Sequence, residues 1–173
     1  MRWPWKKGDS FVCPTCGKPH EGLPSDYGYQ LPDELWALSP VERQAHLDWS
    51  TDIAFLQGRW FIKGVLELPF RFEESRFGWG VWAEVPEDAV KALYAFDRGD
   101  PAPNEPMYGW LATDVVDYPK TSGLDVRIEF SNPALRPLFN LEPDSGHPLA
   151  RQQRDGLDSA EYHAILRAIG SED

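Results

Sequence analysis

Arg76-Phe-Gly-Trp-Gly-Val-Trp-Ala-Glu-Val85 is the stretch of sequence that decides the fold class. A period of two places successive residues on opposite faces of a β-strand. One face then carries Gly78, Gly80 and Trp82, and the other carries larger side chains at positions 77, 79, 81 and 83. The two glycines leave room for a helix, a neighbouring ring or a ligand to lie flat on their face. A helix or a ring is the commoner occupant, so we expect packing here rather than a ligand groove.

Four further segments have the alternation or the short apolar runs of strands. They are residues 53–56, 60–68, 107–112 and 124–130, and Gln57-Gly58-Arg59 between the first two has hairpin character. The expected sheet therefore contains the segments around Phe55, Ile62, Val81, Trp110 and Ile128. We also expect Trp79, Trp82 and Trp110 to be largely buried in one shared aromatic cluster, because they lie on short strands flanked by glycine.

Helix signals are local. Residues 86–96 begin with acidic side chains and repeat apolar ones at helical spacing, and a final helix begins where Asp158 and Glu161 form an approximate capping box. A capping box is also expected at Ser39, and a short helix between Pro148 and Gly156. The helices containing Leu93 and Ile165 should cover the sheet. Because strands and helices do not alternate regularly, the sequence predicts an α+β fold with a mainly antiparallel sheet and a few short helices.

The length of the chain limits the number of domains, and its charge limits the classes of partner. A chain of 173 residues fits one domain over residues 1–173, in which residues 1–30 form an amino-terminal knuckle and an arm packed on the rest. With 17 basic and 28 acidic residues the formal charge is −11, which repels phosphate backbones and argues against nucleic acid as a partner. A basic protein is the easier partner to expect. The sequence does not indicate an oligomeric state.

The segment 1–7 is positively charged, but no apolar run follows it, so no signal peptide is expected. No stretch is apolar enough for a transmembrane helix. The only two cysteines lie in a Cys-x-x-Cys pair, which in a reducing compartment is more often metal-binding or redox-active than a permanent bridge. We therefore expect a cytoplasmic protein.

Cys13, Cys16 and His20 are the strongest chemical signal in the chain. Two thiolates and an imidazole are preferred zinc ligands, and this spacing directs both sulfurs to one point, with Gly17 suited to the tight turn. A closed structural site needs a fourth ligand, for which His147 is the first candidate, followed by Asp52 and His46. The alternatives are a metal-free turn or a reversible disulfide between the cysteines. A thioredoxin-like site is disfavoured, since Gly17-Lys-Pro19 breaks the helix that it requires.

A catalytic interpretation would use His147 as a base beside Asp52 or Gln153. The sequence has no serine elbow, no zinc-protease helix motif and no phosphate-binding loop to accompany it. His163, next to the apolar stripe of the last helix, is expected to lie on the helix surface rather than to bind a ligand.

Taken together, these segments resemble the bacterial family called domain of unknown function 2199. The resemblance rests on Phe11-x-Cys-x-x-Cys-Gly-x-x-His20, Asp52, Phe61-Ile-x-Gly-x-Leu-Glu-Leu-Pro69, Phe77-x-Trp-Gly-Val-Trp82, Tyr108-Gly-Trp-Leu111 and His147-Pro-Leu-x-x-x-Gln153 with Gly156. It implies a small soluble bacterial protein and supplies no mechanism, because the family has no established activity.

Two functional hypotheses follow. The first is a zinc-stabilised binding or interaction protein, similar to an immunity protein, that captures a partner on its acidic and aromatic surface. The second is a small metal-dependent or histidine-dependent enzyme with His147 in its site. Four protein ligands around zinc would favour the first, whereas three ligands and an open water position would favour the second.

Overall fold

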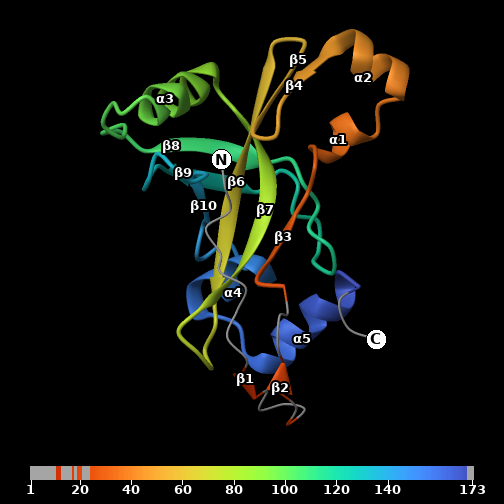
Figure 1. Cartoon of the computed structure of the whole chain (residues 1–173), viewed down its shortest axis with the longest axis vertical. Helices are drawn as coiled ribbons and strands as arrows, with labels where there is room; N and C mark the ends of the chain where they lie inside the picture. Colours follow the sequence, from red (N-terminus) through yellow and green to blue (C-terminus); the bar gives the residue numbers. More distant parts are fainter. Residues whose placement is uncertain (1–10, 13–16, 18, 21–23, 171–173) are drawn as a thin grey trace.

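The computed structural model describes residues 11–12, 17, 19–20 and 24–170 (Figure 1). Its strands are β1 (Phe11–Val12), β2 (Pro19–His20), β3 (Asp26–Gly28), β4 (Leu47–Trp49), β5 (Ile53–Leu56), β6 (Arg59–Pro69), β7 (Arg76–Val85), β8 (Met107–Leu111), β9 (Asp125–Glu129) and β10 (Leu138–Leu141). Its helices are α1 (Asp33–Trp36), α2 (Pro40–His46), α3 (Glu87–Asp97), α4 (Pro148–Asp155) and α5 (Ser159–Ala168). The predicted α+β fold with a mainly antiparallel sheet and short helices is confirmed.

Five consecutive strands, β6 to β10, close into a small barrel. Each strand pairs antiparallel with the next, and β10 returns to pair with β6 in parallel, with Leu138 opposite Val65. The parallel closure follows from the odd number of strands, because in an up-and-down meander the first and fifth strands run in the same direction. Closure removes the open sheet edges that would otherwise be exposed for pairing with another chain.

The long hairpin of β6 and β7 joins the barrel to the remaining strands. Ten residue pairs hold its two strands in register, from Trp60 opposite Val85 to Pro69 opposite Arg76. The first part of β6 also pairs with β5, which pairs with β4, and the first part of β7 pairs in parallel with β3. In Figure 1 this hairpin runs along the long axis, with α1, α2 and α3 toward the upper end and α4 and α5 toward the lower end.

The connection between β5 and β6 is as tight as its sequence predicts. Gln57 and Gly58 both have positive φ angles, 50° and 85°, which is the pattern of a two-residue type I′ hairpin turn. The backbone twist of that turn matches the twist of the two strands, so the register of Ile53 opposite Ile62 is fixed locally.

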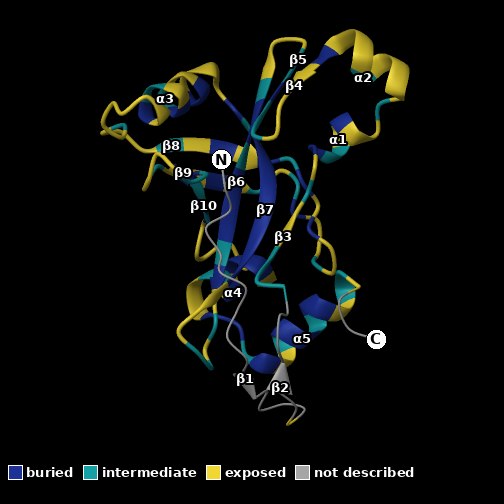
Figure 2. Cartoon of the chain, viewed as in Figure 1, coloured by how far each residue is buried: buried dark blue, intermediate teal, exposed yellow. Residues whose placement is uncertain are grey.

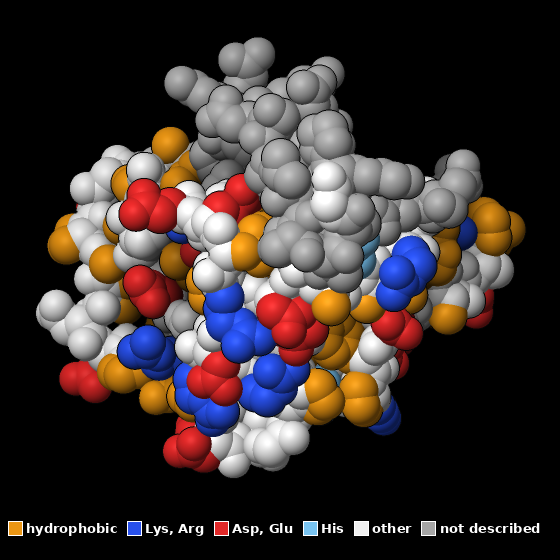
Figure 3. Space-filling view, turned by 90° about the horizontal axis from the view of Figure 1, so that it is seen from below, with side chains coloured by type: hydrophobic (Ala, Val, Ile, Leu, Met, Phe, Trp, Pro, Cys, Tyr) orange, Lys and Arg blue, Asp and Glu red, His pale blue; other side chains and the backbone are white. Residues whose placement is uncertain are grey.

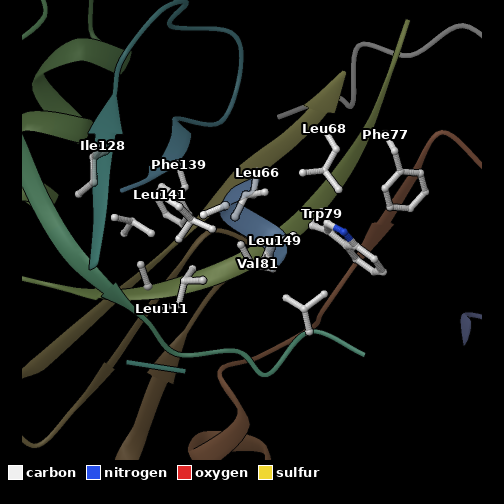
Figure 4. Close-up of a cluster of buried hydrophobic side chains, with 14 of the residues drawn as sticks. Leu66, Leu68, Phe77, Trp79, Val81, Leu111, Ile128, Phe139, Leu141 and Leu149 are labelled. Atoms are coloured by element: carbon white, nitrogen blue, oxygen red, sulfur yellow. The ribbon is translucent and has the colours of Figure 1, made fainter. Parts of the chain in front are cut away.

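The main hydrophobic core fills the barrel and extends to three helices. Its largest fully buried side chains are Trp79 and Phe77 on β7 and Phe139 on β10. Residues such as Leu66, Val81 and Leu149 pack with them (Figure 4). Leu93 on α3 and Ile165 on α5 belong to the same cluster, so the helices predicted to cover the sheet do so. Figure 2 shows β7 and much of β6 as buried along their length, whereas β8 and β9 alternate between buried and exposed residues.

A second, smaller core lies on the other face of the β6–β7 hairpin. Trp82 is fully buried there against Leu35 of α1 and Phe61 of β6, and its indole Nε1 donates to the carbonyl oxygen of Tyr29 at 3.0 Å. A helix and neighbouring side chains therefore pack on the Trp82 side of the strand, as expected from its sequence.

The predicted cluster of three tryptophans is wrong. Trp79 and Trp82 are both fully buried, but they belong to different cores because residues three apart on a strand point to opposite faces. Trp110 is 50% exposed, since it lies on the outward face of β8. A strand in a barrel has one inward face, and in β8 that face carries Gly109 and Leu111 instead.

Helix caps follow the local sequence. Capping boxes are present at Ser39 with Glu42 and at Asp158 with Glu161, as predicted. Helix α2 has no buried residue, and Figure 2 shows it projecting from the barrel with its surface exposed. None of the helices in the described ranges is long and apolar enough to span a membrane.

Arg59 links α1 to the barrel through two carboxylates. Its guanidinium forms bidentate hydrogen bonds to Glu84 and to Glu34, with the Nε to Glu84 Oε1 distance at 2.8 Å. The hydrogen bonds from Arg59 lower the pKa of Glu84 below its usual value.

Because its folded pKa is depressed, Glu84 stabilises the fold above its ordinary pKa, and this contribution is lost as pH falls through the folded pKa. We expect Glu84→Gln to lower the free energy of unfolding at pH 7 by less than about 1 kcal/mol, because the network is partly exposed. The difference between the two proteins should shrink toward pH 3. Urea denaturation at both pH values measures it, and a difference independent of pH would contradict this role.

Candidate functional site

The Cys-x-x-Cys segment connects the strands of a two-stranded hairpin. Strands β1 and β2 pair antiparallel, with Phe11 opposite His20 and Val12 opposite Pro19. Gly17, directly after the second cysteine, has a φ angle of +69°, which favours glycine. Cys13, Cys16 and the side chain of His20 lie outside the described residues, so the structure does not test whether they meet.

His147 has a structural partner at each ring nitrogen. It is the N-cap of α4, where its Nδ1 accepts from the backbone N–H of Leu149 at 3.1 Å. Its Nε2 lies 3.2 Å from the carbonyl oxygen of Pro119, so this nitrogen must carry the proton and donate. These two contacts fix the ring, and binding zinc would require His147 to give up one of them.

The rest of the 147–156 segment docks α4 onto the barrel. The side-chain amide of Gln153 accepts from the N–H of Leu141 and donates to the carbonyl of Phe139, each at 2.8 Å. It thus pairs, as a neighbouring strand would, with the part of β10 after Leu138, the one residue of β10 that pairs with β6. Gly156 ends the helix at a φ of +86°, and a Cβ there would lie 2.9 Å from the carbonyl oxygen of Pro69. This motif therefore has a clear architectural role.

Asp52 forms an ion pair with Arg136 in which both side chains are mostly buried. Lys63 lies beside this pair, and burial, followed by the charge of Arg136, lowers the pKa of its ammonium group. Asp52, His147 and Gln153 do not hydrogen-bond to one another in the described structure. The three groups of the catalytic interpretation each have other partners.

The remaining histidines differ in exposure. His46 is exposed at the end of α2, at the opposite end of the long axis from the β1–β2 hairpin in Figure 1. His163 is only 7% exposed, so its expected place on the helix surface is wrong. Its helix, α5, lies at the same end as the hairpin, and the neighbouring Tyr162 donates to the carbonyl of Pro24 at 2.8 Å.

Across the described ranges, no group of three or more histidine, cysteine or acidic side chains could hold a metal.

A groove on the outer face of the barrel was missed from the sequence. It is a cavity of about 450 Å³ between β8, β9, β10 and α4, lined by Tyr108, Asp125, Arg127, Asn140, Glu142 and Arg154 among others. Tyr108 is 58% exposed and lies on the same outward face of β8 as Trp110. The alternation of residues 107–111 separates these two rings from Leu111, so the sequence indicated that Tyr108 and Trp110 share one face.

Replacing His147 by alanine tests its structural role. We expect the free energy of unfolding to fall by about 1 kcal/mol, because the N-cap hydrogen bond is lost. Asparagine at this position can accept the same N–H, so His147→Asn should recover much of the loss. Thermal denaturation of both variants measures the effect, and an alanine variant as stable as the original chain would contradict this assignment.

Comparison with known proteins gives one match. No curated protein and no solved structure matches the chain. A family model described as an uncharacterized protein conserved in bacteria (DUF2199) matches residues 12–157, which include β2 to β10, α1 to α4 and the whole of the amino-terminal Cys-x-x-Cys motif. The chain therefore belongs to this uncharacterised bacterial family, DUF2199.

Proposed function

We propose that this chain is a zinc-stabilised binding protein in which Cys13, Cys16 and His20 hold a structural zinc ion. The observation that carries the proposal is the β1–β2 hairpin, whose connection contains both cysteines and has a left-handed glycine directly after the second. A hairpin of this kind brings Cys13, at the start of the connection, close to the residues of the returning strand, which include His20. In such turns backbone N–H groups face the thiolates and stabilise them.

The fourth ligand is the open element of this proposal. His147 was preferred from the sequence, but zinc would have to displace a backbone partner from its ring. His163 is the alternative, because it is buried on α5 and its neighbour Tyr162 contacts Pro24, four residues after His20. Four residues of extended chain span at most about 14 Å. His20, at the end of the hairpin, is therefore no farther than this along the chain from Pro24, which contacts α5.

A binding function is favoured over catalysis because the residues of the enzyme hypothesis have structural roles. His147, Gln153 and Asp52, the groups of the enzyme hypothesis, contribute to capping, strand pairing and an ion pair. The net charge of −11 and the exposed aromatic rings suit the capture of a basic protein, as an immunity-like protein would do. A cytoplasmic location is part of the proposal, because reducing conditions keep both thiols available for metal.

Metal content of protein purified without chelator tests the zinc site. We expect one zinc per chain by elemental analysis, near-complete loss in Cys16→Ser, and no loss in the control Thr15→Ser, which lies between the cysteines. Of His147→Ala and His163→Ala, the variant that loses zinc identifies the fourth ligand. Protein that is free of stoichiometric metal would overturn the zinc site and leave a thiol turn or a disulfide.

A further inference from the structure

The outer face of β8, β9 and β10 presents a row of side chains beside α4, of which Tyr108 and Arg127 are exposed and Asn140 is partly buried. Tyr108 is opposite Arg127, and Arg127 is opposite Asn140, so the three side chains cross three neighbouring strands. With strands about 4.8 Å apart the row spans about 10 Å, the length of three residues of an extended chain. The groove of about 450 Å³ lies over this row, and a second cavity of about 270 Å³ shares Asn140 and Gln153 with it.

Two aromatic rings make this face unusual. Tyr108 and Trp110 are two residues apart on one strand, and 58% and 50% of their surfaces are exposed. Each ring has a wide apolar surface and a polar group, and such residues dominate the energetics of protein interfaces. Exposed rings beside a groove therefore mark this face for contact with another molecule.

The charges in the groove favour a cation. Arg154 contacts Asp155 and Asp144, and Arg127 lies 4.0 Å from Glu129. Asp125 and Glu142, in contrast, have no ion-pair partner among the described residues, and both line the groove with Tyr108. The charge left without a partner is therefore negative, and it adjoins an aromatic face that attracts cations.

We propose that this groove binds an extended segment of a basic protein, with a lysine or arginine side chain placed over Tyr108 and between Asp125 and Glu142. This inference rests on the proposed binding function and gives that partner its chemistry. A second copy of the chain is disfavoured as the occupant, because two molecules of charge −11 repel each other. Figure 3, seen from below, shows acidic and basic side chains interleaved at the lower end of the molecule.

Titration with a synthetic peptide tests the proposal. The probe is the blocked hexapeptide (Arg-Ser)3, followed by calorimetry and by amide chemical shifts, with (Glu-Ser)3 as the control peptide. We expect only the arginine peptide to bind and to shift amides of β8, β9 and β10. The pair Asp125→Asn with Glu142→Gln should weaken binding at least tenfold, as should Tyr108→Ala.

The matched control is the pair Glu87→Gln with Asp88→Asn on α3, which changes the net charge by the same amount away from the groove. It should alter affinity less than twofold. Equal weakening by the two pairs, shifts located elsewhere, absence of binding, or concentration-dependent shifts that reveal a second copy in the groove would each overturn the proposal. Cys16→Ser protein should still bind the peptide, so failure of the zinc site and failure of the groove are observed separately.

Discussion

Replacing Trp82 by alanine is expected to lower the free energy of unfolding by about 3–5 kcal/mol. The indole is fully buried between α1 and the β6–β7 hairpin, and its Nε1 donates to the carbonyl of Tyr29. Its removal leaves a large cavity in the smaller core and takes away the indole donor of the partly buried Tyr29 carbonyl. Because this core attaches α1, β4 and β5 to the barrel, those elements should lose hydrogen-exchange protection first.

Trp110→Ala is the matched control, since it removes the same ring from a neighbouring strand of the same sheet. With half of its surface exposed, Trp110 should contribute less than about 1 kcal/mol. Chemical denaturation followed by circular dichroism compares the two variants. If Trp82→Ala and Trp110→Ala lowered the free energy of unfolding equally, the burial of Trp82 in a separate smaller core would be contradicted.

Gly64→Ala should destabilise the barrel by about 1–3 kcal/mol or more. Gly64 lies on β6 with the ring of Phe139 directly against it, and a Cβ at position 64 would come within 2.5 Å of the ring. Phe139 is fully buried on β10 and has no space to withdraw, so the added methyl group would push β10 away from β6. That pair of strands closes the barrel through a single residue pair, Leu138 opposite Val65.

Gly28→Ala provides the control for Gly64. Gly28 also lies in a strand, but the nearest atom to its added Cβ is the flexible end of Lys63 at 3.4 Å. Alanine there should be neutral or slightly stabilising, because it reduces the freedom of the unfolded chain. Adding Phe139→Leu to Gly64→Ala should make the combined loss smaller than the sum of the two single losses. Strict additivity would contradict the contact.

The sequence predicts the parts of the fold that depend on neighbouring residues. Strand alternation in residues 76–85, the Gln57-Gly58 turn and the two capping boxes are decided within a few positions, and all are confirmed. Barrel closure was not predicted, because it depends on the pairing of β10 with β6, more than seventy residues apart. Strand β10 has only four residues and follows a segment rich in proline, so its own sequence signal is weak.

In the candidate site, too, the features set by neighbouring residues could be predicted, and those set by distant contacts could not. The cysteine spacing is a local signal, but the role of His147 depends on the carbonyl of Pro119, which is distant in sequence. The pairing of Gln153 with β10 is likewise a contact between separate elements. For Trp110, alternation indicates which residues share its face, whereas its exposure follows from how the barrel closes and where the helices pack.

Zinc K-edge X-ray absorption of the purified protein tests the central claim most directly. It reports the kind and number of atoms bound to the metal. The account predicts two sulfur ligands at about 2.3 Å and nitrogen ligands at about 2.0 Å, with one nitrogen lost when the histidine that provides the fourth ligand is replaced. A zinc ion surrounded only by oxygen and nitrogen, or a protein that holds no zinc, would contradict it.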